Sequence, residues 1–398
     1  MKKTMRKTFC IMLIITLVLG SAVFAIGTEL PAAPVRNSFV FTGEEINLSL
    51  DEARTMMLTS GAAIERARFN QRTNNAVTRQ SFEAYMAVFA PEAVETAFGE
   101  RTPRGARELR EATDFALVFN REQSSRNFDA EVNNIVRDVV QSYFSMAHAG
   151  EALRISNENV AIHERLYLNT RRSFELGAVS RQDLLRAGVG LNEARINAWR
   201  AEDTFANARM GFNIAFGYDL MQNITLTDSL EQASAPDISL EEAIDMALEN
   251  RNDIHEAGFR LRFAEIMVEH SNRHYSRFSA THLTREANLM GAQTAMEAAP
   301  KTVEMDVRQR YMEMNQKRAD VELGRLNVEN AREAHRLANL QFEVGMMTLT
   351  DVQQAQHTAF QAELGFYRTL LEYNLAIIDF EQSTTVGTNT ILITAPRI

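Results

Sequence analysis

The sequence predicts an all-α fold in which long antiparallel coiled-coil hairpins are made twice, as a tandem structural repeat. The first observation is that two pairs of segments recur in the same order. SLDEARTMMLTSGAAIERA (49–67) aligns without gaps on SLEEAIDMALENRNDIHEA (239–257), and FELGAVSRQDLLRA (174–187) aligns on FEVGMMTLTDVQQA (342–355). The second observation is that long stretches free of proline keep apolar residues at a three-four spacing, which is typical of helices.

The duplication divides the chain into parts. We expect two helical repeats that are joined by a polar linker, with a removable leader and a short extension before them and a tail after them. The expected boundaries are 1–25 for a signal peptide, 26–44 for the extension, 45–225 for the first repeat, 226–238 for the linker, 239–387 for the second repeat and 388–398 for the tail.

The first 25 residues have the pattern of a secretory signal peptide. A basic stretch, MKKTMRK, precedes the apolar run FCIMLIITLVLG, and SAVFA ends in a small residue where a signal peptidase would cut. An uncleaved anchor is the alternative. Cys10, the only cysteine, lies in this segment, so the exported chain would hold no disulfide and no thiolate. The formal net charge of −10 argues against a nucleic-acid surface.

Each repeat opens with a helix start. Ser49 and Ser239 are good N-cap residues, and Glu52 and Glu242 follow them at the capping-box spacing. The stretch 126–176 would then form a helix about 75 Å long at 1.5 Å per residue. Similarly long helices are expected at 181–216, 302–344 and 349–384. Helices of this length need neighbours along their whole length, as in coiled coils.

The repeated FExG stretch predicts a tight turn between two helices. Gly177 can adopt the left-handed conformation that ends a helix. Ser180 can cap the next helix, with Asp183 near its positive end. The second turn repeats this arrangement with Gly345, Thr348 and Asp351.

At these residues the sequence resembles the TolC-like outer-membrane efflux family, over nearly all of the chain after residue 25. The resemblance rests on the duplication, on the SLxEAxxxALxN opening that is best kept at 239–250, and on the FExGxxxxxDxxxA turns. It implies a homotrimer whose hairpins form an α-helical tunnel through the periplasm. Members of that family are passive exit ducts of tripartite efflux and type I secretion systems, and they dock onto a periplasmic adaptor and an inner-membrane transporter.

The resemblance also implies roles for the turns. In that family the hairpin turns form the tunnel entrance and the docking surface for the adaptor. The matching residues here are Gly177, Ala178, Val179 and Ser180 in the first turn and Gly345, Met346, Met347 and Thr348 in the second.

Two roles are open for the acids after the turns. By resemblance, Asp351 stands where an inward-facing acid helps to gate the entrance and favours cations, and Asp183 is its counterpart. One turn on, where a second acid can stand in the family, this chain has Gln354. The alternative is that both acids are helix caps and nothing more.

The sequence departs from the family where the membrane-anchoring β-strands should be. The corresponding places, 88–118 and 276–302, are charged or alanine-rich and lack the alternation of apolar and polar residues that such strands need. We therefore expect short or absent strand insertions and a reduced or missing β-barrel. A helical-hairpin scaffold of the cell envelope without channel activity is the alternative function, and a periplasmic adaptor ranks third.

No pattern of residues predicts catalysis or a bound cofactor. His270 and His274 have a spacing that could hold a metal, but no His-Glu-x-x-His arrangement accompanies them, and we expect a solvated helix face. Phosphate-binding glycine loops and nucleophile elbows are absent from the sequence. The prediction is an exported, non-enzymatic conduit in the outer membrane or the periplasmic space.

Overall fold

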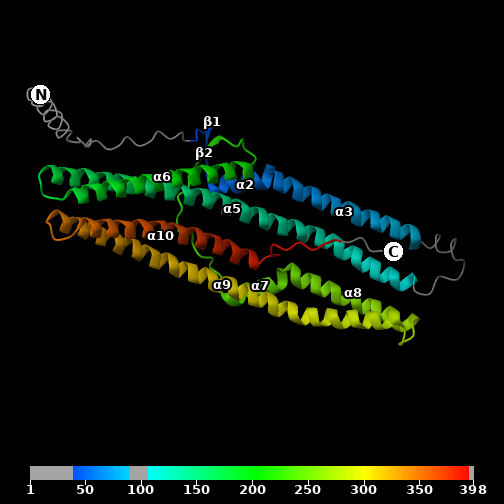
Figure 1. The fold of residues 1–398 in the computed structure, drawn as a ribbon. Helices are drawn as coiled ribbons and strands as arrows, with labels where there is room; N and C mark the ends of the chain where they lie inside the picture. The colour runs from blue at the N-terminus through cyan, green and yellow to red at the C-terminus, as the bar shows by residue number, and fades with distance from the viewer. Residues whose placement is uncertain (1–38, 90–105, 394–398) are drawn as a thin grey trace, which may run out of the picture.

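The computed structural model describes residues 39–89 and 106–393 of the chain, and these are almost entirely helical (Figure 1). The elements run in the order β1 (Thr42–Leu48), α2 (Leu50–Ser60), α3 (Ala62–Phe89), α5 (Ala106–Glu175), α6 (Arg181–Phe216), β2 (Gln222–Leu226), α7 (Leu240–Asn250), α8 (Asn252–His274), α9 (Ala280–Glu343) and α10 (Leu349–Ser383). The all-α fold class predicted from the sequence is confirmed. The predicted signal peptide, 1–25, lies outside the described residues.

Two helices, α5 and α9, run the length of the molecule. They contain 70 and 64 residues, or about 105 and 96 Å at 1.5 Å per residue. Toward one end α5 pairs with α6 and α9 with α10, and toward the other end α5 pairs with α3 and α9 with α8 (Figure 1). Each repeat therefore builds two antiparallel hairpins that share one long helix.

Both long helices begin earlier than the sequence suggested. The expected starts were 126 and 302, whereas α5 begins at Ala106 and α9 at Ala280. Within α9 the helix continues through Pro300. The run from Ala292 to Ala299 consists largely of strong helix formers, which offsets the hydrogen bond that the proline cannot donate. Residues 280–302 are thus helix, in agreement with short or absent strand insertions there, while 90–105 lie outside the described residues.

The helix starts have the predicted caps. The Ser49 hydroxyl accepts from the backbone N–H of Glu52, and the Glu52 carboxylate accepts from the backbone N–H of Ser49 at 2.8 Å. Ser239 and Glu242 form the same box at the start of α7. These hydrogen bonds lower the pKa of Glu242 below its ordinary value.

A small sheet that the sequence did not reveal sits beside the first repeat. β1 and β2 pair in parallel, with Ile46 opposite Ile224 and Leu48 opposite Leu226. Ile224 is fully buried, and it packs in the same cluster as residues of α2, α5 and α6. The sheet thereby fixes the chain before α2 to the segment that follows α6.

Several buried positions of α5 recur in α9 at a constant separation of 168 residues, as from Ile135 to Val303. Val139 corresponds in this way to Val307, and Met146 to Met314, and all of these side chains are buried. The two long helices therefore bury equivalent faces against their own hairpin partners.

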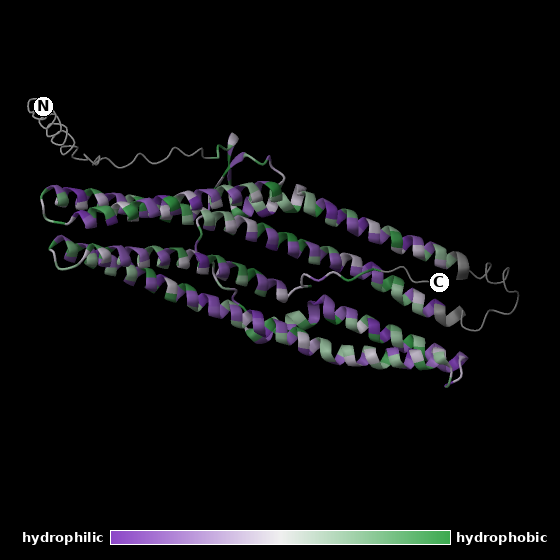
Figure 2. Ribbon diagram, in the orientation of Figure 1, coloured by the Kyte–Doolittle hydropathy of each residue, from purple (hydrophilic) through white to green (hydrophobic). Residues whose placement is uncertain are grey.

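Each long helix is amphipathic and carries polar residues on part of its surface (Figure 2). Among residues 39–89 and 106–393, no helix has an apolar run long enough for it to cross a membrane.

Candidate functional site

The two turns that the sequence singled out lie side by side at one end of the molecule (Figure 1). The first tip, residues 176–180, joins α5 to α6, and the second tip, residues 344–348, joins α9 to α10. The two tips project from neighbouring helical hairpins because α10 packs against α5.

Each tip is closed by a left-handed glycine. Gly177 has φ +74°, and the N–H of Ala178 reaches back to the carbonyl of Ser173 at 2.8 Å. Gly345 has φ +73°, and the N–H of Met346 donates to the carbonyl of Gln341 at 2.8 Å. Both tips therefore satisfy the last carbonyls of their long helix in the same way.

Both tip acids cap the helix that follows. The Ser180 hydroxyl donates to Asp183 at 2.7 Å, and the Thr348 hydroxyl donates to Asp351 at 2.6 Å. Each carboxylate also accepts from the backbone N–H of its cap residue, at 3.2 and 3.1 Å respectively. The Thr348 hydroxyl and N–H hold the pKa of Asp351 below its ordinary value, so this carboxylate is charged at neutral pH.

The two acids differ in exposure although they share this geometry. Asp183 is half-buried and lines a groove of about 560 Å³ between the two tips. Asp351 is exposed and is not among the residues that line this groove. The acid that the resemblance placed at the gate thus faces solvent in the single chain, and its counterpart in the first repeat faces the second tip.

Most of the residues that the sequence assigned to docking meet at this groove. Ala178, Val179, Gly345, Met347 and Thr348 line it. In the first tip Val179 is half-buried and its neighbour Ala178 is exposed. In the second tip Met347 is half-buried and its neighbour Met346 is exposed. The tips therefore combine a recessed apolar surface with an outward-facing one.

Two outward-facing residues were missed in the sequence. Leu176 is 79% exposed and Val344 is 69% exposed, and with Met346 at 80% they form the apolar surface of the tips. The signal was present, since both FExG motifs place an apolar residue directly before the glycine. Exposed apolar side chains that gather on two neighbouring tips are typical of an interaction surface.

Polar side chains join the hairpins just behind the tips. Arg186 of α6 donates to the hydroxyl of Thr350 of α10 at 2.8 Å. Both residues line a polar pocket of about 290 Å³, whose lining also includes His163 and His357. Burial lowers the pKa of His163, and the nearby His335 and His357 lower it further.

The described residues, 39–89 and 106–393, contain no group of three or more ligating side chains placed to hold a metal ion. His270 and His274 lie side by side on α8, with ring centroids 5.0 Å apart. His270 is buried, and its Nδ1 lies 2.6 Å from the guanidinium of Arg285. The expectation that both histidines lie on a solvated helix face is therefore wrong for His270, which packs between α8 and α9.

Comparison with known proteins places this arrangement among the folds of outer membrane efflux proteins. A family model described as "Outer membrane efflux protein" matches residues 108–213 and 274–377, more than half of the chain, and both tips lie inside the matched segments. No curated protein sequence matches the chain at a significant level.

Several solved structures share the fold. A membrane protein from Pseudomonas aeruginosa has a TM-score of 0.67 and 17% identity, over 90% of this chain and 96% of that one. The CmeC outer membrane channel of Campylobacter jejuni has a TM-score of 0.65 and 15% identity, over 85% and 86% of the two chains. The outer membrane protein VceC of Vibrio cholerae has a TM-score of 0.68 and 10% identity, over 85% and 97%.

Proposed function

The chain belongs to the outer membrane efflux protein family, and from this premise we propose that it is the passive exit duct of a tripartite efflux or type I secretion machine. Family membership assigns the protein to the cell envelope, as the sequence predicted.

The observation that carries the proposal is the paired tips. Two turns from different repeats lie together, present Leu176, Val344 and Met346 to solvent, and enclose a groove between them. A periplasmic adaptor that docks at this end would bury the exposed side chains and fill the groove. Burial of three large apolar side chains would contribute about 1.5–3 kcal/mol each before entropic costs.

A single chain cannot enclose a tunnel. Its hairpins form a layer with two free edges (Figure 1). We therefore propose a homotrimer, in which three such layers close side by side. The inner-membrane transporter would supply the energy, as the family resemblance of the sequence implies.

The two tip acids, Asp351 and Asp183, would have different roles in this assembly. Asp351 is charged at neutral pH and exposed in the single chain. In a trimer, tips brought together at the entrance would carry three copies of it, and their field would favour cations. Asp183 would act mainly as a helix cap that also shapes the groove between the tips.

Single-channel recording tests the central claim. The purified protein is added to planar bilayers, with an established duct of the same family as a positive control. Stepwise openings are expected. Persistent silence while the control conducts would overturn the duct and favour a helical-hairpin scaffold of the envelope.

A tip variant tests docking separately. Met346→Asp should abolish co-purification with the adaptor, because it places a charge in the buried interface. Phe278→Asp is the matched control, since Phe278 is also exposed, at 91%, but lies between α8 and α9 at the opposite end. Equal loss of binding in both variants would argue against docking at the tips.

A further inference from the structure

Three histidines gather where the two hairpins meet behind the tips. His163 lies on α5, His335 on α9 and His357 on α10, so the first repeat contributes one of them and the second repeat two. Burial lowers the pKa of His163, and the charges of His335 and His357 lower it further. Burial likewise lowers the pKa of His335, and so does Arg165 of α5. The three side chains are therefore close enough to act on one another as an electrostatic cluster.

The ring of His163 packs against the backbone of α6. A β-carbon at Gly190 of α6 would lie 3.2 Å from His163 Nδ1 and 2.7 Å from Nε2 of Gln353 on α10. Because Gly190 has no side chain, α5, α6 and α10 can meet at one point. His163 is a titratable group at this point of contact.

The Nδ1 atom of His163 is buried and makes no hydrogen bond to the described residues. In the neutral ring one of the two nitrogens carries a proton, whereas in the protonated ring both are N–H donors. Protonation therefore places a charged donor at Nδ1 with no acceptor beside it. A buried charge without a partner is costly, so the protonated ring fits this position poorly.

The surroundings of His163 supply little negative charge. Among the described residues that line the pocket, Glu193 of α6 is the only acid, and Arg186 of the same helix carries the opposite charge. On α5, Glu164 is already paired with Arg195 of α6 at 3.0 Å. No free carboxylate is thus placed to compensate a proton on His163 within this pocket.

The seam between α6 and α10 passes through the same point. It is bridged by the hydrogen bond of 2.8 Å from Arg186 to Thr350 and by a longer one, 3.4 Å, from Gln353 to the carbonyl of Arg186. A cluster of buried apolar side chains that includes Leu191 and Val352 holds the hairpins together nearby. The tips project directly beyond this seam, so a separation of the hairpins here would widen the groove between the tips.

We propose that His163, His335 and His357 form a proton-controlled switch, which drives the two hairpins apart and separates the tips at mildly acidic pH. Histidine titrates in this range more readily than any other side chain. Protonation places like charges at one junction, and the charged ring of His163 must turn toward solvent to hydrate Nδ1. The closed tips described above correspond to the neutral cluster, and protons shift the population toward separated tips.

The distance between the two tips measures the switch. Leu176→Cys and Val344→Cys place one nitroxide label on each tip, at positions that are 79% and 69% exposed, and Cys10→Ser removes the only native cysteine. Labelled copies are co-expressed with an excess of copies that lack both tip cysteines, so that distances within one chain dominate. Pulsed electron paramagnetic resonance at about pH 7.5 and about pH 5.5 should show a longer label-to-label distance at the lower pH.

Two variants of His163 test the trigger. His163→Gln keeps a polar side chain that does not titrate, and it should keep the short distance at both pH values. His163→Arg carries its charge at both pH values and should show the longer distance at both. Circular dichroism checks that both variants retain their helices. An equal lengthening in His163→Gln, or no lengthening in the background protein, would overturn the switch.

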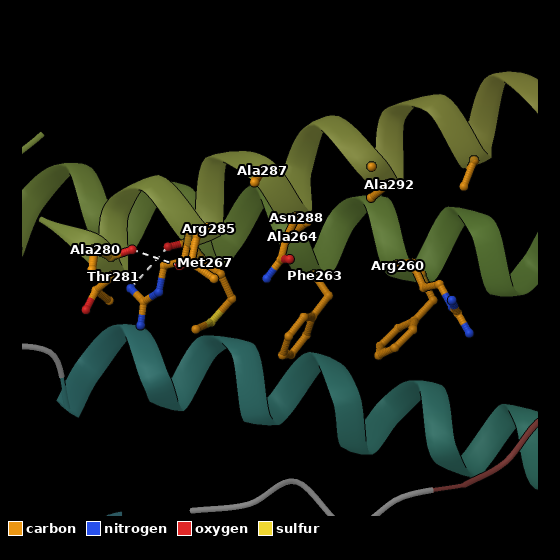
Figure 3. Close-up of a pocket in the computed structure, with 14 residues that line it drawn as sticks. Arg260, Phe263, Ala264, Met267, Ala280, Thr281, Arg285, Ala287, Asn288 and Ala292 are labelled. Atoms are coloured by element: carbon orange, nitrogen blue, oxygen red, sulfur yellow. Dashed lines mark hydrogen bonds between the residues drawn. The ribbon is translucent and has the colours of Figure 1, made fainter. Parts of the chain in front are cut away.

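His148 and His270 provide the controls. His148 is the matched one, because it lies on α5 and burial lowers its pKa too, but it does not line the pocket. His270 is buried at the opposite end beside Arg285, which lines a separate groove between α8 and α9 (Figure 3). His148→Gln and His270→Gln should lengthen as the background protein does. Loss of the response in either one would place the trigger outside the cluster.

The switch rests on the proposed function, in which the tips are the entrance of the duct, but the two can fail separately. The distance measurement needs neither a bilayer nor an adaptor. A pH-dependent distance in a protein that stays silent in bilayers would overturn the duct and leave the switch standing. Conduction with an unchanged distance would overturn the switch alone. Asp351 does not confuse the result, because Thr348 holds its pKa below its ordinary value and its charge is constant across this range.

Discussion

Gln356 of α10 donates a hydrogen bond of 2.8 Å to the side-chain oxygen of Asn159 of α5, and both residues are almost fully buried. The bond connects the two repeats along the junction that leads to the tips. This pair matches one buried donor with one buried acceptor.

The first prediction concerns this pair. Asn159→Ala should lower the free energy of unfolding by about 1–3 kcal/mol, because the amide of Gln356 is then left buried and unpaired. Replacement of both residues by leucine should cost much less, since it removes donor and acceptor together. Urea unfolding of the single and double variants measures the difference. A double leucine variant that costs as much as Asn159→Ala would show that an unpaired buried amide is not the source of the loss.

The second prediction concerns the turn of the second tip. Gly345 has φ +73°, and a β-carbon there would meet no atom within 4 Å, so the cost of a side chain is backbone strain alone. Gly345→Val should therefore destabilise the second tip by about 1–2 kcal/mol.

Gly365 is the matched control for that change. It lies within α10, and a β-carbon there also has open space, but its φ is not positive. Gly365→Ala should stabilise the helix by about 0.5–1 kcal/mol. If both variants shift the thermal midpoint in the same direction, the left-handed turn does not determine the effect.

The third prediction is a pH dependence behind the tips. Burial lowers the pKa of His163 below its ordinary value of 6.5, so the unfolded chain binds a proton in a pH range where the folded chain does not. Stability should therefore fall as the pH drops from about 7 toward about 5, through the unfolded value and toward the folded one. Unfolding midpoints measured across this range should show a smaller decline in His163→Gln. An equal slope in both proteins would place the titration elsewhere, for example at the half-buried His335, whose pKa burial also lowers.

The parts of this fold that depend on neighbours in sequence could be predicted, and those that depend on distant contacts could not. Gly177 and Gly345 end their helices because of their own φ angles, and Ser180 caps the next helix through a residue three positions on. Local chemistry is sufficient for such features.

The pairing of β1 with β2 shows the limit. Ile46 and Ile224 are far apart in the chain, and each strand is too short for its residue pattern to predict the strand it pairs with. The C-terminal segment is a similar case. Asn127 holds the backbone of Ile391 through two hydrogen bonds of 2.7 and 2.8 Å, and an asparagine within a helix gives no sign of such a role.

The candidate site was predicted only in part, because it also depends on contacts between segments that are distant in the sequence. The motif identified both tips, but the groove between them exists because α10 packs on α5, which no local pattern encodes. The difference in exposure between the two tip acids could not be predicted from the sequence either. Asp183 and Asp351 have the same sequence context and the same cap geometry, and only the packing of the hairpins separates the half-buried one from the exposed one.

The last prediction separates the two roles of Asp351. The hydrogen bonds from Thr348 lower its pKa, so its contribution to stability is present above the ordinary value of 3.8 and is lost as the pH falls through the lower folded value. Its charge is therefore constant across neutral pH. In the assembled duct, Asp351→Asn should lower the permeability of cations relative to anions, because it removes a charge from each copy at the entrance.

Thr348→Ala provides the comparison, since it removes the cap hydroxyl and keeps the charge. It should lower stability by about 1 kcal/mol and leave ion selectivity unchanged. Asp183→Asn tests the counterpart in the first tip and should change selectivity less than Asp351→Asn. Reversal potentials recorded across a salt gradient at neutral pH measure all three variants. Unchanged selectivity in Asp351→Asn, together with a loss of stability like that of Thr348→Ala, would reduce Asp351 to a helix cap and remove the acidic entrance from the proposed mechanism.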